Sequence, residues 1–418
     1  MKFRPVRGMK DLYGFDVKKY DFIIAKAREV GEKYGYEVIN TPIVEYTEVF
    51  KRSIGDDTDV VSKEMYTFTD KGGESITLRP EGTAGVIRAI VTEAMTQKLP
   101  LKLMYYGQMF RYDRPQKGRY RQFHQIGFEC VGDKSPYTDA ITIAISTEIL
   151  NAIGIFDFKI LLNTLGDEKT RENYTKAIVK YLSRYEDKLS QESKDRLIKN
   201  PLRILDSKDK DDIEICSMAP VITDYLSKEA GEYFEKVCQL LDGYHMSYEI
   251  SNALVRGLDY YSHTTFELKS TGGVYGDALG GGGRYDSLLS IFGGPNVSGV
   301  GFAIGVERLL LFLDSDKFSS KNDKVAVIPV SDADNDNAFC LFKELQSYGI
   351  ATEFIHIGNL GKKMKFADRL KCRLALIIGE DERKNFTVTV KFMSIDNEKL
   401  KIKTIDRSKV VDFVKYNK

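Results

Sequence analysis

The chain has 418 residues, which is long for one hydrophobic core and predicts roughly two or three domains. Hydrophobic residues make up 42% of it and charged residues 29%, the composition of an ordinary soluble protein. A net charge of +1 excludes a globally basic nucleic-acid binder, so any contact with RNA must use a local basic patch.

The cysteines and the start of the chain indicate a cytosolic protein. The cysteines are scattered and favour reduced thiols over a zinc site or a disulfide framework; they are Cys130, Cys216, Cys238, Cys340 and Cys372. The first residues, MKFRPVRGMKDLYG, lack the apolar run of a signal peptide, and no segment is apolar over the length of a membrane span. We therefore expect a cytoplasmic protein without a membrane segment.

A helix followed by a strand is predicted near the N-terminus. Residues with helical spacing between Tyr20 and Tyr34 favour a helix over about residues 17–34. Residues 36–39 then have strand character and end before Thr41 and Pro42. By itself, this pattern is common and indicates no function.

Glu81 and Thr83 are the first candidate site residues. They lie two positions apart in TLRPEGT, and in an extended chain they would share one side. A carboxylate beside a hydroxyl suits an ammonium group, although an isolated Glu-Gly-Thr is more often a turn than a site.

The most informative stretch is FRYDRPQKGRYRQFHQIGFE, residues 110–129. After the basic turn at residues 114–118, a strand with a side-chain period of two would place the odd positions on one face. These positions are Arg119, Arg121, Phe123, Gln125, Gly127 and Glu129. The even positions Ile126, Phe128 and Cys130 can pack a core.

The polar face of this strand has two interpretations. It could be polar because water covers it. The order of its side chains favours a binding floor, because arginines suit phosphate, Phe123 offers a stacking surface, and Gln125 with Glu129 can orient a small polar molecule. We therefore predict a site for a nucleotide and a metabolite. His124 lies on the other face, where packing is favoured over catalysis.

The segment LVRGLDYYSHTTFE, residues 254–267, is the second informative stretch. It follows a region rich in lysine, glutamate and leucine, about residues 167–248, which predicts a helical insertion in a β-rich domain. Arg256 stands beside the flexible backbone of Gly257. Tyr260 and Tyr261 should point to opposite sides of a strand, so at least one should reach a site. The alternative is an ordinary strand with an exposed arginine.

Two glycine-rich segments follow. GGGGRYDSL, residues 280–288, permits a ligand to approach the backbone closely. GVGFAIGVERLLLFL, residues 299–313, is no dinucleotide fingerprint, because no apolar strand precedes its first glycine. We expect Glu307 within it to be only a salt-bridge partner. The chain near Gly361 and Lys362 lacks the residues of a phosphate-binding P-loop.

The last part of the chain predicts a separate domain. From Val325, strands alternate with helices, which indicates a small α/β domain with a largely parallel sheet. The polar residues 316–324 are the expected linker. Residues 362–373 hold six basic residues and one acidic residue, Asp368, and such charged runs are most often solvated helix faces.

Several segments resemble the signature motifs of class II aminoacyl-tRNA synthetases. Residues 110–129 resemble the second motif, a hairpin that holds ATP and the tRNA acceptor end; the N-terminal helix and strand resemble the first, and residues 299–313 the third. RGLDYY narrows the resemblance to histidyl-tRNA synthetases, as do residues 280–288 and NPLRILDSKD followed by CSMAP. GNLGKKMKFADRL with LALIIGEDE is the match in the last domain.

This resemblance implies a fold and a set of partners. An α+β catalytic domain with an antiparallel sheet, residues 1–320, would carry the helical insertion at about 167–248, and a small α/β anticodon-binding domain, residues 325–418, would follow. A homodimer would form through the first motif. The partners would be tRNA(His), histidine and ATP.

The resemblance also implies a reaction and a role for each matched residue. Histidine and ATP, with Mg²⁺ on ATP and pyrophosphate, would form histidyl-adenylate, and the histidyl group would pass to the 3′ end of tRNA. Arg256 and Arg111 would contact the α-phosphate, where fixed planar cations stabilise developing charge. ATP would contact Arg111, Arg119, Arg121, Phe123 and Arg308, with adenine between the last two. Histidine would contact Glu81, Gly82, Thr83, Arg111, Gln125, Glu129, Arg256, Tyr260 and Tyr261. No metal site built from protein ligands is expected.

Two alternatives remain. One is a non-catalytic, synthetase-like regulatory subunit of histidine biosynthesis, a type of relative that typically lacks both RGLDYY and the C-terminal domain. The other is a synthetase for a different amino acid, which Glu129 and the paired tyrosines disfavour.

Overall fold

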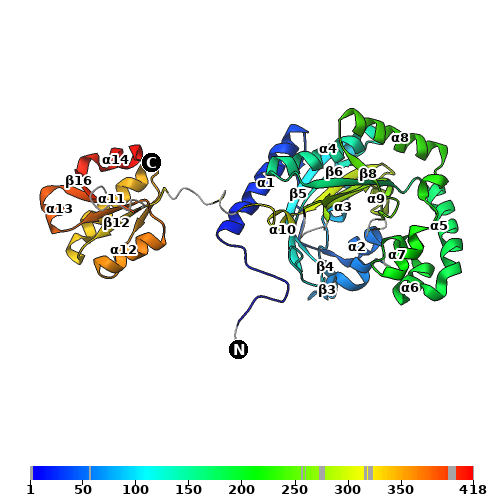
Figure 1. Ribbon diagram of the computed structural model, residues 1–418, viewed down its shortest axis with the longest axis horizontal. Helices are drawn as coiled ribbons and strands as arrows, with labels where there is room; N and C mark the ends of the chain where they lie inside the picture. Colours follow the sequence, from blue (N-terminus) through cyan, green and yellow to red (C-terminus); the bar gives the residue numbers. More distant parts are fainter. Residues whose placement is uncertain are drawn as a thin grey trace. The chain divides into compact units, whose positions relative to one another are not determined.

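The computed structural model describes residues 3–55, 58–255, 258, 260–272, 278–314, 318, 323–393 and 402–417. The chain divides into two compact units, Met1–Asp314 and Ser315–Lys418, and each has its own hydrophobic core (Figure 1). Within the described ranges, no helix has both the length and the apolar character needed to cross a membrane.

The first unit is built on an eight-stranded sheet in the order β1-β5-β6-β11-β10-β9-β7-β8. Its strands are antiparallel to their neighbours except at the two edges, where β1 is parallel to β5 and β8 to β7. In this order they span Glu37–Val38, Leu101–Phe110, Gln122–Val131, Gly299–Gly305, Ala278–Arg284, Ser262–Ser270, Phe158–Thr164 and Tyr248–Ile250. The antiparallel sheet expected for this part of the chain is confirmed.

Three helices pack on one face of this sheet (Figure 1): α1 Phe15–Lys33, α4 Pro136–Ile153 and α8 Lys228–Gly243. Ile23, Ala27 and Val30 of α1 are spaced at helical intervals, so they form one buried stripe. Gly31 extends this stripe, and a Cβ there would lie 2.6 Å from the Sδ of Met104. The glycine therefore lets α1 approach the sheet closely.

The opposite face of the sheet carries α3 Thr83–Thr92, which shares a core with Leu103 and Tyr105. Met104 between them belongs to the first core, because side chains alternate along β5. A separate antiparallel sheet has the order β2-β4-β3, with bounds Val44–Tyr46, Ser75–Leu78 and Tyr66–Thr69. The short helical segments of this unit are α2 Thr47–Ile54, η1 Val60–Glu64, η2 Met95–Lys98, α9 Leu288–Ile291 and α10 Val306–Leu309.

The chain between β7 and β8 is a helical insertion. Its elements are α5 Glu168–Leu182, η3 Ser183–Lys188, α6 Gln191–Lys199, η4 Pro201–Asp206, α7 Lys210–Ser217, η5 Ile222–Tyr225 and α8. The carboxylate of Asp167 accepts a hydrogen bond from the backbone N–H of Thr170, which caps the start of α5. Buried Asp212 accepts hydrogen bonds from the hydroxyls of Ser190 and Ser207, which connects α7 to the segments on both sides of α6.

The second unit contains a five-stranded sheet in the order β13-β12-β14-β15-β16, with bounds Thr352–Phe354, Val325–Pro329, Leu374–Ile378, Thr387–Phe392 and Ile402–Asp406. The first three strands are parallel and the last two antiparallel, so the sheet is mixed rather than largely parallel. Its helices are α11 Asn335–Ser347, α12 Leu360–Arg369, α13 Glu380–Asn385 and α14 Val410–Tyr416, with short turns η8 Asp332–Asp334 and η10 Arg407–Lys409.

The predicted basic segment lies on α12 and the chain that follows it. Lys362, Lys365 and Arg369 are exposed. Lys363 is buried and donates a hydrogen bond to the carbonyl of Pro329, and Arg373 donates one to the carbonyl of Val414. The exposed basic surface is therefore smaller than the sequence suggests.

Candidate active site

A cavity of about 370 Å³ opens on the side of the large sheet where Glu129 lies. Most of the predicted site residues line it: Glu81, Thr83, Arg111, Arg119, Phe123, Gln125, Glu129, Tyr260, Tyr261 and Arg308. Gly82 and Arg121 are described by the structure but do not line the cavity. Arg256 lies outside the described residues, so its predicted place against a phosphate remains a prediction.

Small residues form the floor of the cavity where β6, β11 and β10 run side by side. Glu129 pairs across the sheet with Gly301, and Gly301 with Gly283. The next row on this face pairs Ala303 with Gly281. A Cβ at Gly301 would lie 1.8 Å from the Oε2 of Glu129, so glycine is needed there to leave space for the carboxylate.

Glu129 is the buried polar centre of this floor. Its side chain is 1% exposed, and it accepts hydrogen bonds from the hydroxyls of Thr83, at 2.7 Å, and Tyr285, at 2.5 Å. Burial raises the pKa of Glu129 to about 8, which the nearby charge of Glu81 reinforces and the two hydrogen bonds oppose. A carboxyl group with this pKa can hold or release a proton near neutral pH.

Glu81 caps the helix that delivers Thr83 to the cavity. Its carboxylate oxygens accept hydrogen bonds from the backbone N–H groups of Thr83, at 2.7 Å, and Ala84, at 2.8 Å. The prediction that Glu81 and Thr83 share one side of an extended chain is therefore wrong, because Thr83 is the first residue of α3. The free N–H groups at the start of the helix attract the carboxylate instead. Burial raises the pKa of Glu81.

Arginines gather at the other end of the cavity. Arg111 directly follows β5, and its Nε donates to the carbonyl of Pro80 at 2.8 Å. Its guanidinium group lies 5.6 Å from the centre of the Phe123 ring. Arg308 of α10 donates to the carbonyl of Ala278 and also lines the cavity. Aromatic, cationic and carboxylate groups therefore occur in one cavity.

The alternation fails for the arginines that precede the strand. β6 begins at Gln122, so Arg119 and Arg121 belong to the preceding loop, whose Gly118 has a positive φ. Arg119 forms an ion pair with Asp113 at the cavity. The guanidinium group of Arg121 lies 3.5 Å from the centre of the Tyr112 ring, outside the cavity lining. The common face predicted from period two thus begins only at Phe123.

Tyr260 and Tyr261 both line the cavity, and the centres of their rings are 4.6 Å apart. The prediction that they point to opposite sides of a strand is wrong, because both precede β9. His124 is packed against Tyr20, and its Nδ1 lies 2.6 Å from the Oε1 of Glu307. Glu307 therefore pairs with His124, and His124 packs against neighbouring side chains, as the sequence predicts.

Comparison with known proteins decides the family. The family model described as Histidyl-tRNA synthetase matches residues 8–309, and the one described as Anticodon binding domain matches residues 324–417. The chain belongs to the histidyl-tRNA synthetase family. Members of this family are ligases that form aminoacyl-tRNA, and the chain is an enzyme of this class.

Similar synthetases cover nearly the whole chain. A histidine–tRNA ligase of Rhodospirillum rubrum is 45% identical over 93% of this chain and 94% of its own length. That of Rickettsia akari is 42% identical over 99% of both. The crystal structure of the apo histidyl-tRNA synthetase of S. aureus has 34% identity and a TM-score of 0.80, and the match covers 99% of this chain and 100% of that one. The synthetase interpretation is therefore favoured over the regulatory subunit.

Tyr285 and Glu267 are polar cavity residues that the sequence patterns did not single out. Tyr285 follows the glycine run of β10 and holds Glu129, while Glu267 of β9 lines the cavity beside Gly281, its partner across the sheet. The first could have been suspected because a tyrosine directly after a glycine-rich strand has space to reach across it. Nothing distinguishes the second from an ordinary strand residue.

Proposed function

We propose that the cavity binds histidine and ATP and forms histidyl-adenylate with release of pyrophosphate. The histidyl group then passes to the terminal adenosine of tRNA(His), and AMP is released. The observation that carries this proposal is the buried Glu129 on a glycine floor, held by Thr83 and Tyr285, with arginines in the same cavity. A small donor ring can reach the carboxylate, and a polyphosphate can reach the arginines.

Glu129 is proposed to accept a hydrogen bond from the imidazole ring of histidine. The raised pKa supports this role, because burial disfavours the ionised carboxyl and a ligand that brings a donor or a positive charge offsets this cost. Glu81 and Thr83 would face the α-ammonium group, with the backbone of Gly82 between them, and Gln125 the carboxylate. Tyr260 and Tyr261 would enclose the ring.

ATP is proposed to enter with Mg²⁺ bound to its phosphates. Adenine would stack between Phe123 and Arg308. Arg111, and Arg256 from the other side, would stabilise charge on the α-phosphate during attack by the histidine carboxylate. Arg119 would contact the outer phosphates. For Arg121 we propose no contact with ATP; it would position the loop through its contact with the ring of Tyr112.

A homodimer and a tRNA contact complete the proposal. Strand β1 lies at an edge of the large sheet, and Phe15 and Val17 at the start of α1 are exposed, so this region could join a second copy across a twofold axis. The second unit would bind the anticodon through the exposed basic residues of α12. A protein that charges tRNA for translation would act in the cytoplasm.

ATP–pyrophosphate exchange with each of the twenty amino acids tests the proposal. Exchange is expected with histidine and not with the others, and tRNA(His) should accept the histidyl group. Histidine-independent exchange, or none with any amino acid, would contradict it. The second outcome would favour the regulatory subunit.

A further inference from the structure

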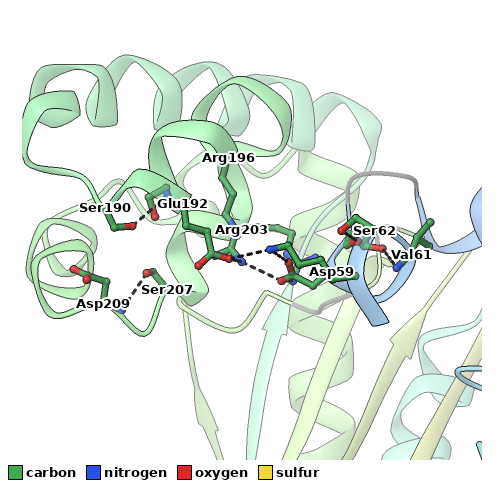
Figure 2. A network of polar contacts seen from close by, with 12 residues as sticks. Asp59, Val61, Ser62, Ser190, Glu192, Arg196, Arg203, Ser207 and Asp209 are labelled. Atoms are coloured by element: carbon green, nitrogen blue, oxygen red, sulfur yellow. Dashed lines mark hydrogen bonds and ion pairs between the residues drawn. The ribbon is translucent and has the colours of Figure 1, made fainter. Parts of the chain in front are cut away.

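A charged network connects the helical insertion to a short segment beside the cavity (Figure 2). Asp59, immediately before η1, lies at its centre. The Oδ2 of Asp59 is 3.1 Å from the Nη2 of Arg196 and 3.5 Å from the Nη2 of Arg203, and its Oδ1 is 3.0 Å from the Nζ of Lys63. Arg196 lies on α6 and Arg203 on η4, so the carboxylate connects two elements of the insertion to η1.

The geometry of this network differs from that of an isolated surface pair. The side chains of Arg196 and Arg203 are only 19% and 12% exposed. Glu192 also contacts Arg196 at 2.7 Å, and Figure 2 shows both arginines pointing toward Asp59. Burial alone would raise the pKa of Asp59, but the hydrogen bond from Lys63 and the three cations lower it below its ordinary value. The carboxylate is therefore ionised at neutral pH.

The segment that Asp59 holds reaches the catalytic cavity. Val60, the first residue of η1, lines the cavity. At the other end of η1, the carbonyl of Glu64 accepts a hydrogen bond of 2.7 Å from the backbone N–H of Tyr112. Tyr112 stands between Arg111 and Asp113, which both line the cavity. Residues 58–65 thus connect the insertion to the arginine end of the site.

We propose that Asp59 is a positioning residue through which the helical insertion holds the Arg111 side of the cavity in place. This inference rests on the proposed function and extends it to a residue that contacts no substrate. Val60 packs with Phe50 and Ile54, which fixes η1 against α2, and the ion pairs of Asp59 fix it to the insertion. Loss of the ion pairs would free one attachment of η1 and loosen the contact between Glu64 and Tyr112.

Asp59→Asn tests this link, because it removes the charge and keeps the size of the side chain. Misplacement of a catalytic group by about 1 Å can cost roughly a hundredfold in rate. We therefore expect kcat/KM for ATP in the exchange reaction to fall by about tenfold or more. Asp59→Glu, which keeps the charge, should recover part of the loss. Glu232→Gln is the matched control, because it removes an ion pair with Lys228 inside the insertion.

Hydrogen exchange at the amide of Tyr112 gives a readout that does not depend on activity. Asp59→Asn should accelerate this exchange, and Glu232→Gln should leave it unchanged. Lost stability with unchanged Tyr112 exchange and unchanged kcat/KM would show a merely structural role and overturn the proposal. If Asp59→Asn does not fold, Arg196→Gln and Arg203→Gln break the same link from the other side. A wild-type protein without histidine-dependent exchange would refute the proposed function, whereas the Tyr112 measurement would still test Asp59.

Discussion

Replacement of Glu129 by glutamine should change how the stability of the first unit depends on pH. The carboxyl has an ordinary pKa of 4.5 in the unfolded chain and about 8 in the folded one. A group whose pKa is higher in the folded state binds more protons there than in the unfolded chain. The free energy of unfolding that Glu129 contributes therefore falls as pH rises from 4.5 through about 8. Glutamine has nearly the same shape and carries no proton to lose.

The magnitude follows from the two pKa values. At about 1.4 kcal/mol for each tenfold change in proton affinity, the ionised Glu129 costs the folded state about 5 kcal/mol at high pH. About 3 kcal/mol of this cost develops between pH values of about 5.5 and 8.5, as the linkage relation gives. The side chain is 1% exposed, so little screening by solvent reduces this figure.

Urea unfolding of wild type and Glu129→Gln at both pH values measures this difference. The free energy of unfolding of the wild type should fall by about 3 kcal/mol more than that of the variant over this range. Glu81 and all other carboxyls are present in both proteins, so the comparison isolates Glu129 and its coupling to Glu81. Parallel pH profiles would refute the raised pKa and, with it, the electrostatic argument for imidazole binding.

The remaining predictions concern catalysis and tRNA binding. Arg256→Ala and Arg111→Ala should each lower ATP–pyrophosphate exchange about a hundredfold to a thousandfold, because each removes a pre-organised cation. Histidine binding, measured by calorimetry, should change less. Exchange at the wild-type rate in either variant would exclude that arginine as an electrophilic group. Tyr285→Phe should raise KM for histidine by up to about tenfold, since the hydrogen bond from Tyr285 to the largely protonated carboxyl of Glu129 contributes roughly 0.5–1.5 kcal/mol. An unchanged KM would separate Tyr285 from histidine recognition. A chain ending near Lys324 should keep ATP–pyrophosphate exchange activity but charge tRNA poorly. Its tRNA binding should depend less steeply on salt than that of the full-length protein. Equal aminoacylation by the shortened and full-length proteins would refute anticodon binding by the second unit.

The alternation of side chains in the sequence correctly predicted which residues line the cavity where those residues belong to a single strand. Phe123, Gln125 and Glu129 line the cavity because they belong to β6, and a strand alternates regardless of its partners. The same rule failed for Arg121 and for the paired tyrosines, which lie in turns before strands begin. Single-sequence periodicity gives no exact first residue of a strand, and a one-residue error changes which side a side chain faces.

Contacts between distant segments were beyond the reach of the sequence pattern. Glu129 obtains its hydrogen bonds from Thr83, 46 positions away, and Tyr285, 156 positions away. The local sequence around Thr83 gives no sign of its contact with Glu129, and the position of Tyr285 after a glycine-rich strand does not indicate which residue it contacts. Residues 402–406, which form β16, give no strand signal in the sequence for another reason: β16 is an edge strand with mostly exposed side chains, so it lacks the apolar alternation by which strands are recognised.

The two buried carboxylates of the cavity differ in what they can offer a substrate, and α3 causes the difference. Glu81 already accepts hydrogen bonds from two backbone N–H groups at the start of the helix, and these bonds oppose the rise in its pKa that burial causes. Glu129 accepts only hydroxyl hydrogen bonds among its described contacts, from Thr83 and Tyr285. A hydroxyl can rotate away from its acceptor, whereas the amides at the start of a helix are fixed and aligned with the helix dipole, so hydroxyls stabilise a buried charge less well. Glu129 is therefore the carboxylate with most to gain from a substrate that brings its own N–H donor, as an imidazole ring does.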